Sequence, residues 1–549
     1  MRRILLLSAT AAMMAAAAPS AFAQTDNDAV MKRLDQMQKM IDAQQKQIES
    51  QKKEIGGLNK ALGRKGALPA PAPETIAAPA PVTPAAPPPI VETRLQQQDQ
   101  KIDDVIAKFA AEQDARRLAA QEQPQASVTN GRLQIASADG RFSAALRATV
   151  QYDVGYYMQG NQARTLPTGA DLSSGSNFRR AQLGLQGKVF GDWSYYVNID
   201  YGSGGSSGTE APGHIQQAYV EYDGFGPFIF RIGAHPPSTG LDDSYAASDQ
   251  LLMERSAPGD LTRNMAGGDG RDSIELLYVG ENLYGSFAYT GDKVQETTFL
   301  NDEQQAVVGR VAYSPVANAD WRWLVSLAAT DVFRPGDSTA ALNSARPFSL
   351  KNLPELNVDD NSTALVSVSD ANVTDAWDWN LESAVTYDNF LAQAGYFKYG
   401  VDQRAVTTLR GQGFDGWYVE GSWVLTGESR AYSAANAAFT NPRPRTNFSP
   451  DGGGWGAFEL AGRYSTLDLN DNQGVIGGAL PAGGVRGGEQ RVATLGLNWY
   501  PNQVLKFTLQ AQNVQASKIG ANTVLIPNVA NANLGQNYDT IALRTQLAF

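Results

Sequence analysis

The feature that most constrains this chain is a strict alternation of polar and apolar side chains, clearest in FRRAQLGLQGKVFGDWSYYVNIDYG, residues 178–202. Arg180 and Gln182 fall on one face of an extended chain, whereas Leu183 and Leu185 fall on the other. Successive side chains of a β-strand point to opposite faces, so a period of two indicates a strand. A Gly-Asp step separates two such runs, which predicts a hairpin turn.

The same alternation recurs from about residue 141 to residue 549. It predicts about sixteen strands, each near the ~9–11 residues that a tilted strand needs to cross a bilayer. Short turns alternate with longer loops rich in Gly, Asp, Ser and Asn, which is typical of periplasmic turns and extracellular loops. We therefore expect an all-β fold, a transmembrane antiparallel β-barrel with apolar residues toward lipid and polar residues toward a water-filled lumen. A secreted β-sandwich or solenoid is the alternative, but it would not explain charged residues on the inward face of nearly every strand.

Composition excludes several classes of function. The chain has no cysteine and two histidines, His214 and His235, which argues against a thiolate or histidine metal centre. A net charge of −11 argues against a nucleic-acid partner, because a binding surface for phosphates is basic. No Ser-His-Asp arrangement is found, neither histidine has a recognisable G-x-S-x-G partner, and the Gly-rich stretch at 267–273 lacks the P-loop lysine. We therefore expect no enzymatic activity, cofactor or metal.

The segments before the strands have other patterns. Residues 1–23 are typical of a secretory signal peptide, with Arg2 and Arg3 before an apolar run that ends in Ala-Phe-Ala. Apolar residues repeat every seven positions within 24–65, which predicts a self-associating coiled-coil helix. Residues 66–91 form a Pro/Ala-rich linker, residues 92–126 a short helical segment, and residues 130–549 the barrel domain.

The barrel region resembles the phosphate-selective porin O and P family of Gram-negative outer membranes. The resemblance rests on residues 178–202, GPFIFRIGAHPPSTGLDDSYAASDQLLMERSAPG, DGGGWGAFELAGRYSTLDLND, TLGLNWYPN and the closing LRTQLAF, in this order. It implies a sixteen-stranded barrel, a homotrimer, and a third extracellular loop that folds inward to narrow the pore. The terminal Phe549 matches the assembly signal typical of outer-membrane barrels.

The inward loop is expected to run from about Gly233 to Asp272. Rings of basic side chains select anions and rings of acidic ones select cations. Family members that select phosphate carry lysines on this path, but no lysine occurs here between Arg231 and Lys293. The candidate pore-lining residues for anions are Arg147, Arg180, Lys188, Arg231, Arg255, Arg263, Arg271, Arg310, Arg322, Arg463, Lys506 and Arg544.

The leading interpretation is an outer-membrane porin for passive diffusion of small hydrophilic solutes, with a bias toward anions such as phosphate. The alternative is a general or cation-tolerant porin whose N-terminal arm, in the periplasm, also tethers the outer membrane to the cell wall. Expected partners are outer-membrane lipid, two further copies of the chain, small solutes or anions, and the cell wall through the arm.

Overall fold

The structure is a computed structural model of the chain. It describes residues 100–101, 104–114, 123–129, 131–160, 171–202, 213–294, 302–318, 320–336, 348–359, 363–370, 373–403, 411–520, 524–526, 529–530 and 535–549. The chain divides into two compact units, Met1–Asp103 and Asp104–Phe549, and every element below belongs to the second. The expected signal peptide, coiled coil and Pro/Ala linker lie outside the described residues.

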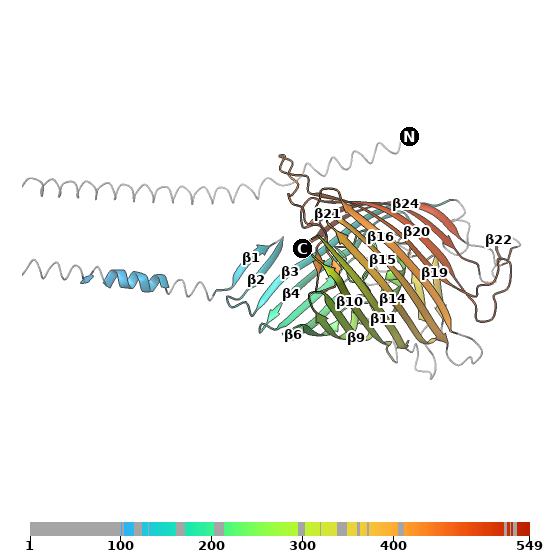
Figure 1. Cartoon of the computed structure of the whole chain (residues 1–549), viewed down its shortest axis with the longest axis horizontal. Helices are drawn as coiled ribbons and strands as arrows, with labels where there is room; N and C mark the ends of the chain where they lie inside the picture. Colours follow the sequence, from blue (N-terminus) through green and yellow to red (C-terminus); the bar gives the residue numbers. More distant parts are fainter. Residues whose placement is uncertain are drawn as a thin grey trace, which may run out of the picture. The chain divides into compact units, whose positions relative to one another are not determined.

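Sixteen antiparallel strands close into a barrel (Figure 1), because the last strand pairs along its length with the first. The prediction of the fold class is therefore confirmed. The barrel strands are β3 (Ser143–Met158), β4 (Gly175–Val189), β5 (Trp193–Asp200), β6 (His214–Phe225), β7 (Phe228–Ala234), β8 (Arg271–Val279), β9 (Leu283–Lys293), β10 (Gln305–Ala317), β11 (Trp321–Arg334), β14 (Val373–Tyr387), β15 (Phe390–Gln403), β16 (Gln412–Val424), β19 (Ala457–Asp471), β20 (Val485–Tyr500), β21 (Leu505–Ser517) and β24 (Gln536–Ala548).

The other elements lie in the connections or before the barrel. β1 (Gln125–Thr129) and β2 (Arg132–Ala136) form a hairpin, and β2 extends the sheet beside the start of β3. Small hairpins are formed by β12 (Phe348–Asn352) with β13 (Val366–Asp370), β17 (Tyr432–Ser433) with β18 (Ala438–Phe439), and β22 (Val524–Ile526) with β23 (Val529–Ala530). The helical elements are residues 104–114 and α4 (Ala257–Ala266). No helix among the described residues is long and apolar enough to cross a membrane.

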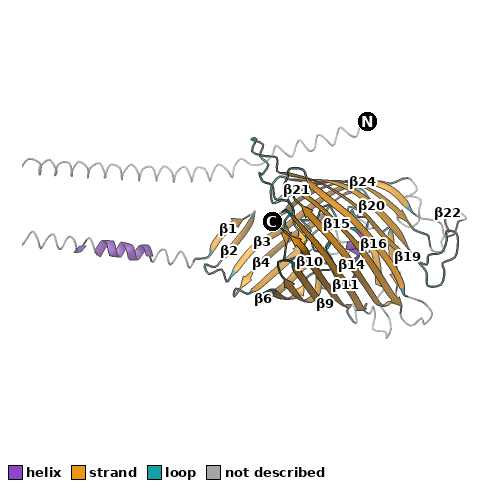
Figure 2. Ribbon diagram, viewed as in Figure 1, coloured by secondary structure: helices purple, strands orange, loops and turns teal. Residues whose placement is uncertain are grey.

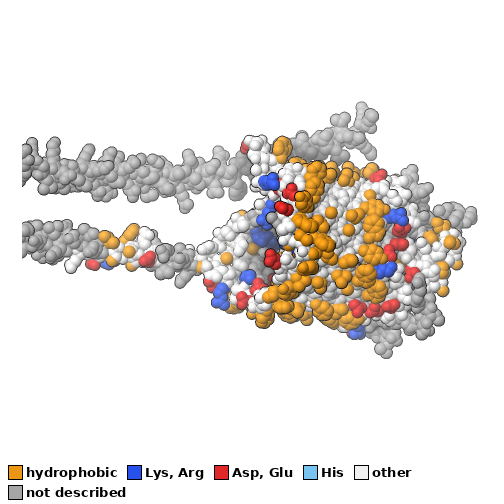
Figure 3. All heavy atoms as spheres, in the orientation of Figure 1, with side chains coloured by type: hydrophobic (Ala, Val, Ile, Leu, Met, Phe, Trp, Pro, Cys, Tyr) orange, Lys and Arg blue, Asp and Glu red, His pale blue; other side chains and the backbone are white. Residues whose placement is uncertain are grey.

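The strand pattern produces a barrel with its apolar side outward. Leu183 and Leu509 are 53% and 48% exposed on the outer face, whereas their strand neighbours Gln182 and Thr508 are buried inside. Figure 3 shows the apolar side chains as a broad band across the outer surface of the strands. A barrel in lipid buries polar groups and exposes apolar ones, so this inversion supports the membrane interpretation.

The tight turn predicted after β4 is present and has its own conformational signature. Phe190 and Gly191 both have positive φ, 56° and 89°. Val189 pairs with Trp193, so the loop contains three residues, Phe190 to Asp192, one more than the predicted Gly-Asp step. Three-residue hairpin loops commonly include a residue with positive φ. The strands that this turn joins, β4 and β5, pair from Val189 with Trp193 to Gln182 with Asp200.

Short turns join the strands at one end of the barrel, which we call the short-turn end. Longer connections join them at the other end, which we call the long-loop end. The expected inward loop is the connection between β7 and β8, residues 235–270, and it folds into the lumen with α4, drawn in purple in Figure 2. One connection departs from the predicted alternation. The return segment, residues 425–456 between β16 and β19, is long although it lies at the short-turn end.

Candidate functional site

The inward loop is a folded element. Ser256 caps α4, because its hydroxyl accepts a hydrogen bond from the Gly259 amide, and Asp242 Oδ2 in turn accepts from the Ser256 amide and hydroxyl at 2.9 and 2.7 Å. Leu261 and Met265 on α4 pack into an apolar cluster with residues of the barrel strands. The loop therefore presents a fixed surface to the lumen.

One side of the inward loop is anchored to the barrel at β14 and β16. The buried Glu382 carboxylate accepts hydrogen bonds from the amides of Leu241 and Asp242, the second at 3.1 Å, and from the Tyr418 hydroxyl at 2.8 Å. Next to it, the Asn380 side chain donates to the Thr239 carbonyl at 2.9 Å. A buried polar group left without its partners carries a desolvation penalty, so these contacts hold the loop against this side.

The other side of the loop is anchored by ion pairs through Glu254. Its carboxylate contacts Arg179 on β4 and Arg544 on β24, both at 2.8 Å. Burial alone would raise the pKa of Glu254, but the two guanidinium groups outweigh it and hold the pKa below its usual range. Arg544 also pairs with Asp153 on β3 at 2.7 Å. The loop thus spans the lumen between two parts of the barrel.

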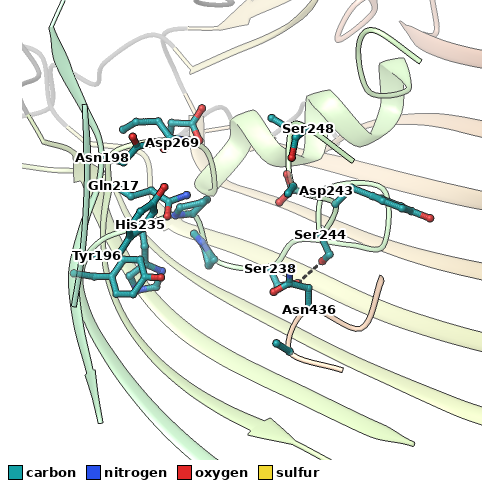
Figure 4. Close-up of a pocket in the computed structure, with 18 of the residues that line it drawn as sticks. Tyr196, Asn198, Gln217, His235, Ser238, Asp243, Ser244, Ser248, Asp269 and Asn436 are labelled. Carbon is teal, nitrogen blue, oxygen red and sulfur yellow. Dashed lines mark hydrogen bonds between the residues drawn. The ribbon is translucent and has the colours of Figure 1, made fainter. Parts of the chain in front are cut away.

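Beside the loop the lumen keeps a cavity of about 330 Å³. Its lining comes from β3 to β9, the inward loop and two residues of the return segment, Ala435 and Asn436 (Figure 4). Amides and hydroxyls make up much of the surface. The charged lining residues are Arg147, Arg180, Arg231, Arg255, Arg263, Asp243, Asp269 and Glu275. Five arginines against three carboxylates leave an excess of positive charge, although the whole chain carries −11.

Three of the five arginines are paired with carboxylates. Arg231 contacts Glu221 at 2.9 Å and Glu275 at 3.2 Å. Arg255 and Arg263 share Asp243, at 3.3 and 2.6 Å. Burial would raise the pKa of Asp243, but these two arginines outweigh it and hold the pKa below its usual range.

Arg147 and Arg180 form no ion pair with any residue that the structure describes. Arg180 is buried and donates one hydrogen bond to the Gln151 amide oxygen at 2.7 Å. Both guanidinium groups line the cavity. They are therefore the arginines whose charge is least compensated at the surface of the cavity.

The other predicted basic residues lie elsewhere. Lys188 pairs with Asp223 at 2.9 Å near the short-turn end, and Arg271 donates to the carbonyls of Gly267 and Gly291. The remaining contacts are Arg310 with Ser326, Ser244 and two carbonyls, Arg322 with the Tyr432 ring, Arg463 with Glu355 and Glu420, Lys506 with the Gln250 carbonyl, and Arg544 as above. The structure thus brings five of the twelve candidates to one cavity and places the others against fixed protein groups.

His235 is the first residue of the inward loop and lines the cavity. Its imidazole meets the Tyr219 ring edge to face, and neither of its nitrogens has a hydrogen-bond partner among the described residues. Burial, together with the Arg231 charge, lowers the pKa of His235 to about 3. The imidazole is therefore neutral at neutral pH and adds no charge to the cavity.

Two functional contacts were missed by the sequence reasoning. A register shift between β3 and β4 next to Gln151 interrupts the alternation, so Arg179 reaches the inward loop although its neighbour Arg180 also faces inward. Adjacent arginines in a strand were the available signal for this bulge. Arg430 pairs with Glu459 at 2.7 Å from within the return segment, for which the alternation gave no signal.

A metal site has no support in the described part of the chain, since no group of three or more His, Cys, Asp or Glu residues is arranged to hold an ion. A closed barrel of sixteen strands, an apolar outer band and a folded loop beside a polar cavity instead define an outer-membrane channel of the porin class.

Comparison with known proteins identifies the family. Residues 144–549 match the family described as phosphate-selective porin O and P, and the chain belongs to it. Porin O of Pseudomonas aeruginosa is 25% identical over 419 residues, which cover 72% of this chain and 88% of that protein. Both relationships support a location in the Gram-negative outer membrane.

Two solved structures are similar in fold. The outer membrane channel DcaP of Acinetobacter baumannii is 11% identical, with a TM-score of 0.41, and the match covers 74% of this chain and 97% of that one. An anion-selective porin from Comamonas acidovorans is 12% identical, with a TM-score of 0.42, and the match covers 74% of this chain and 100% of that one.

Proposed function

We propose that this porin passes small hydrophilic anions by passive diffusion through the cavity beside the inward loop, without catalysis or a cofactor. The observation that carries the proposal is the excess of arginine over carboxylate on the cavity surface. Positive charge on the lining of a narrow pore attracts anions and repels cations. A guanidinium group also offers several N–H donors to a carboxylate or phosphate oxygen.

Within this cavity Arg147 and Arg180 are the proposed anion-holding residues, because no ion pair within the described ranges compensates their charge. Arg231, Arg255 and Arg263 are proposed to contribute more weakly, since each shares its charge with a carboxylate. The permeant anion is proposed to exchange its water for these side chains and for the neighbouring amides of Gln182 and Asn198.

The test is the zero-current reversal potential of the purified protein in a planar bilayer under a KCl gradient, repeated with phosphate added. An anion-selective potential is expected, with chloride current reduced by phosphate. A neutral or cation-selective potential would refute the anion bias and leave a general porin. An anion-selective potential without block by phosphate would keep the bias and exclude phosphate as a preferred ligand.

The assembly and the N-terminal arm remain proposals. We propose a homotrimer, which the predicted coiled coil at residues 24–65 supports. The arm, with its linker at 66–91, is proposed to lie in the periplasm and to contact the cell wall. Deleting residues 27–122 is expected to spare conductance and to weaken envelope attachment; unchanged attachment would refute the tether.

A further inference from the structure

The cavity is narrowed from both ends of the barrel. The inward loop enters from the long-loop end, and the return segment enters from the short-turn end. Ala437, Ala438 and Phe439 of the return segment are buried in one apolar cluster with Leu241 and Tyr245 of the inward loop. Figure 4 shows Ser238 and Ser244 of the loop close to Asn436 of the segment, at the edge of the cavity.

Arg310 on β10 lies where these two segments meet, and its side chain is 1% exposed. Its Nη1 contacts Ser238 Oγ at 3.1 Å and Ser244 Oγ at 2.6 Å on the inward loop. The same nitrogen contacts the Asn436 carbonyl, and Nη2 donates to the Ala437 carbonyl, both at 2.8 Å.

Two further contacts fix the orientation of this guanidinium. Nε donates to Ser326 Oγ on β11 at 2.8 Å, and the Tyr284 ring of β9 lies 5.3 Å from its central carbon. All three nitrogens therefore have oxygen partners. Those partners are neutral, and no carboxylate in the described residues pairs with Arg310.

The two carbonyls of the return segment that accept hydrogen bonds from Arg310 lie in a tight turn. The turn joins β17 to β18, and Ala437 within it has a positive φ of 43°. A non-glycine residue in this region persists only when its surroundings hold it there. The bond from Arg310 to the Ala437 carbonyl is one of the contacts that do so.

We infer that Arg310 is a positioning residue that sets the width of the channel by fastening the return segment to the inward loop. It does not serve as an anion ligand, because its donors are already directed to protein oxygens. Arginine is required for this role, because its planar guanidinium group carries several N–H donors and can hydrogen-bond to a strand, a loop and a turn at the same time. The inference rests on the channel function but not on the anion bias.

The first test compares Arg310→Lys with Arg310→Met and the wild type in single-channel recordings. Lysine keeps the charge but provides a single nitrogen. A positioning role predicts that both variants raise conductance, roughly twofold or more, because conductance follows pore width. An anion-ligand role instead predicts that Arg310→Lys behaves like the wild type and that Arg310→Met loses anion selectivity. Wild-type conductance in Arg310→Lys would overturn the inference.

A control and a rescue separate positioning from misfolding. Arg334→Lys changes an exposed arginine that pairs with Asp302 at the long-loop end, and it is expected to leave conductance unchanged. The chain has no cysteine, so Ser244→Cys and Asn436→Cys can be joined selectively by a short thiol crosslinker in the Arg310→Lys protein. Crosslinking is expected to return conductance to the wild-type value. Conductance that stays raised after verified crosslinking would overturn the inference, even if Arg310→Met fails to fold.

The reversal potential distinguishes this failure from failure of the proposed function. If the wild type is not anion-selective, the anion bias fails while the conductance comparison still tests Arg310. If the wild type is anion-selective and Arg310→Lys has wild-type conductance, the positioning role fails while the proposed function stands.

Discussion

Replacing Arg180 by alanine is predicted to lower the preference for chloride over potassium about fourfold. Arg180 lines the cavity and has no ion-pair partner in the described part of the chain, so its charge acts directly on a passing ion. The cavity of about 330 Å³ has an equivalent radius of about 4 Å. An ion at its centre therefore passes about 6 Å from a guanidinium in the lining.

The magnitude follows from that distance. Two unit charges about 6 Å apart in water interact by about 0.7 kcal/mol. Screening in ~0.1 M salt, where the Debye length is about 10 Å, reduces this to about 0.4 kcal/mol. In the variant, chloride loses this attraction and potassium loses the equal repulsion. The free-energy difference between the two ions in the cavity therefore changes by about 0.8 kcal/mol, which corresponds to about a fourfold change in the chloride-to-potassium permeability ratio.

The assay is the reversal potential in a KCl gradient around ~0.1 M, where the screening estimate applies. Arg147→Ala is expected to give a similar shift, and the double variant to combine the two. Lys188→Ala is the matched control, because it removes the same charge from a residue that pairs with Asp223 and does not line the cavity. The reasoning is refuted if Arg180→Ala keeps the wild-type potential, or if Lys188→Ala shifts it equally.

Further predictions concern the loop, its titration and the assembly. Glu382→Gln should weaken one anchor of the inward loop by about 1–3 kcal/mol, because an amide NH2 replaces one of the two accepting oxygens. The expected readout is added current noise, and recordings of the variant as quiet as those of the wild type would contradict this. The pKa values of Asp243 and Glu254 are held below their usual range, so their ion pairs stabilise the folded loop above the unfolded pKa near ~4 and are lost as pH falls through the folded values. Conductance should therefore rise only below about pH 4, and a rise at pH 6 would contradict this assignment. His235→Gln should leave the pH dependence of the reversal potential between about pH 5 and 8 as in the wild type, because the pKa of His235 is about 3. Chemical crosslinking in mild detergent should give a trimer as the largest species; a dimer would refute the proposed assembly.

The alternation of residue types was sufficient to predict the barrel. In a membrane barrel each strand has one face toward lipid and one toward the lumen. The polarity of each residue and its neighbours therefore indicates which of the two it faces. The family resemblance implied an inward loop at about 233–272, and the structure has it at 235–270, between β7 and β8. The return segment lacked such a signal. Its burial depends on Phe439 meeting Leu241, residues that are distant in the sequence.

The charged residues show why the site was harder to predict than the fold. Arg180 and Arg310 both alternate inward, and the pattern assigns them the same role. The structure gives Arg180 one amide partner and a place on the cavity, whereas it gives Arg310 several oxygen partners, including a carbonyl of Asn436. The alternation in a strand determines whether a side chain points into the lumen or toward lipid. The hydrogen-bond partners of an inward arginine, however, lie in loops, whose irregular backbone cannot be predicted from a repeating pattern.

The charge of a pore therefore cannot be obtained by counting inward arginines. An arginine changes the energy of a passing ion when its guanidinium faces the water of the cavity, as that of Arg147 does. One surrounded by protein oxygens, such as Arg310, is shielded from that water and acts on the pore through the position of the segments it holds. We therefore propose that selectivity and conductance are controlled by different arginines of the same barrel, and that each can be altered without the other.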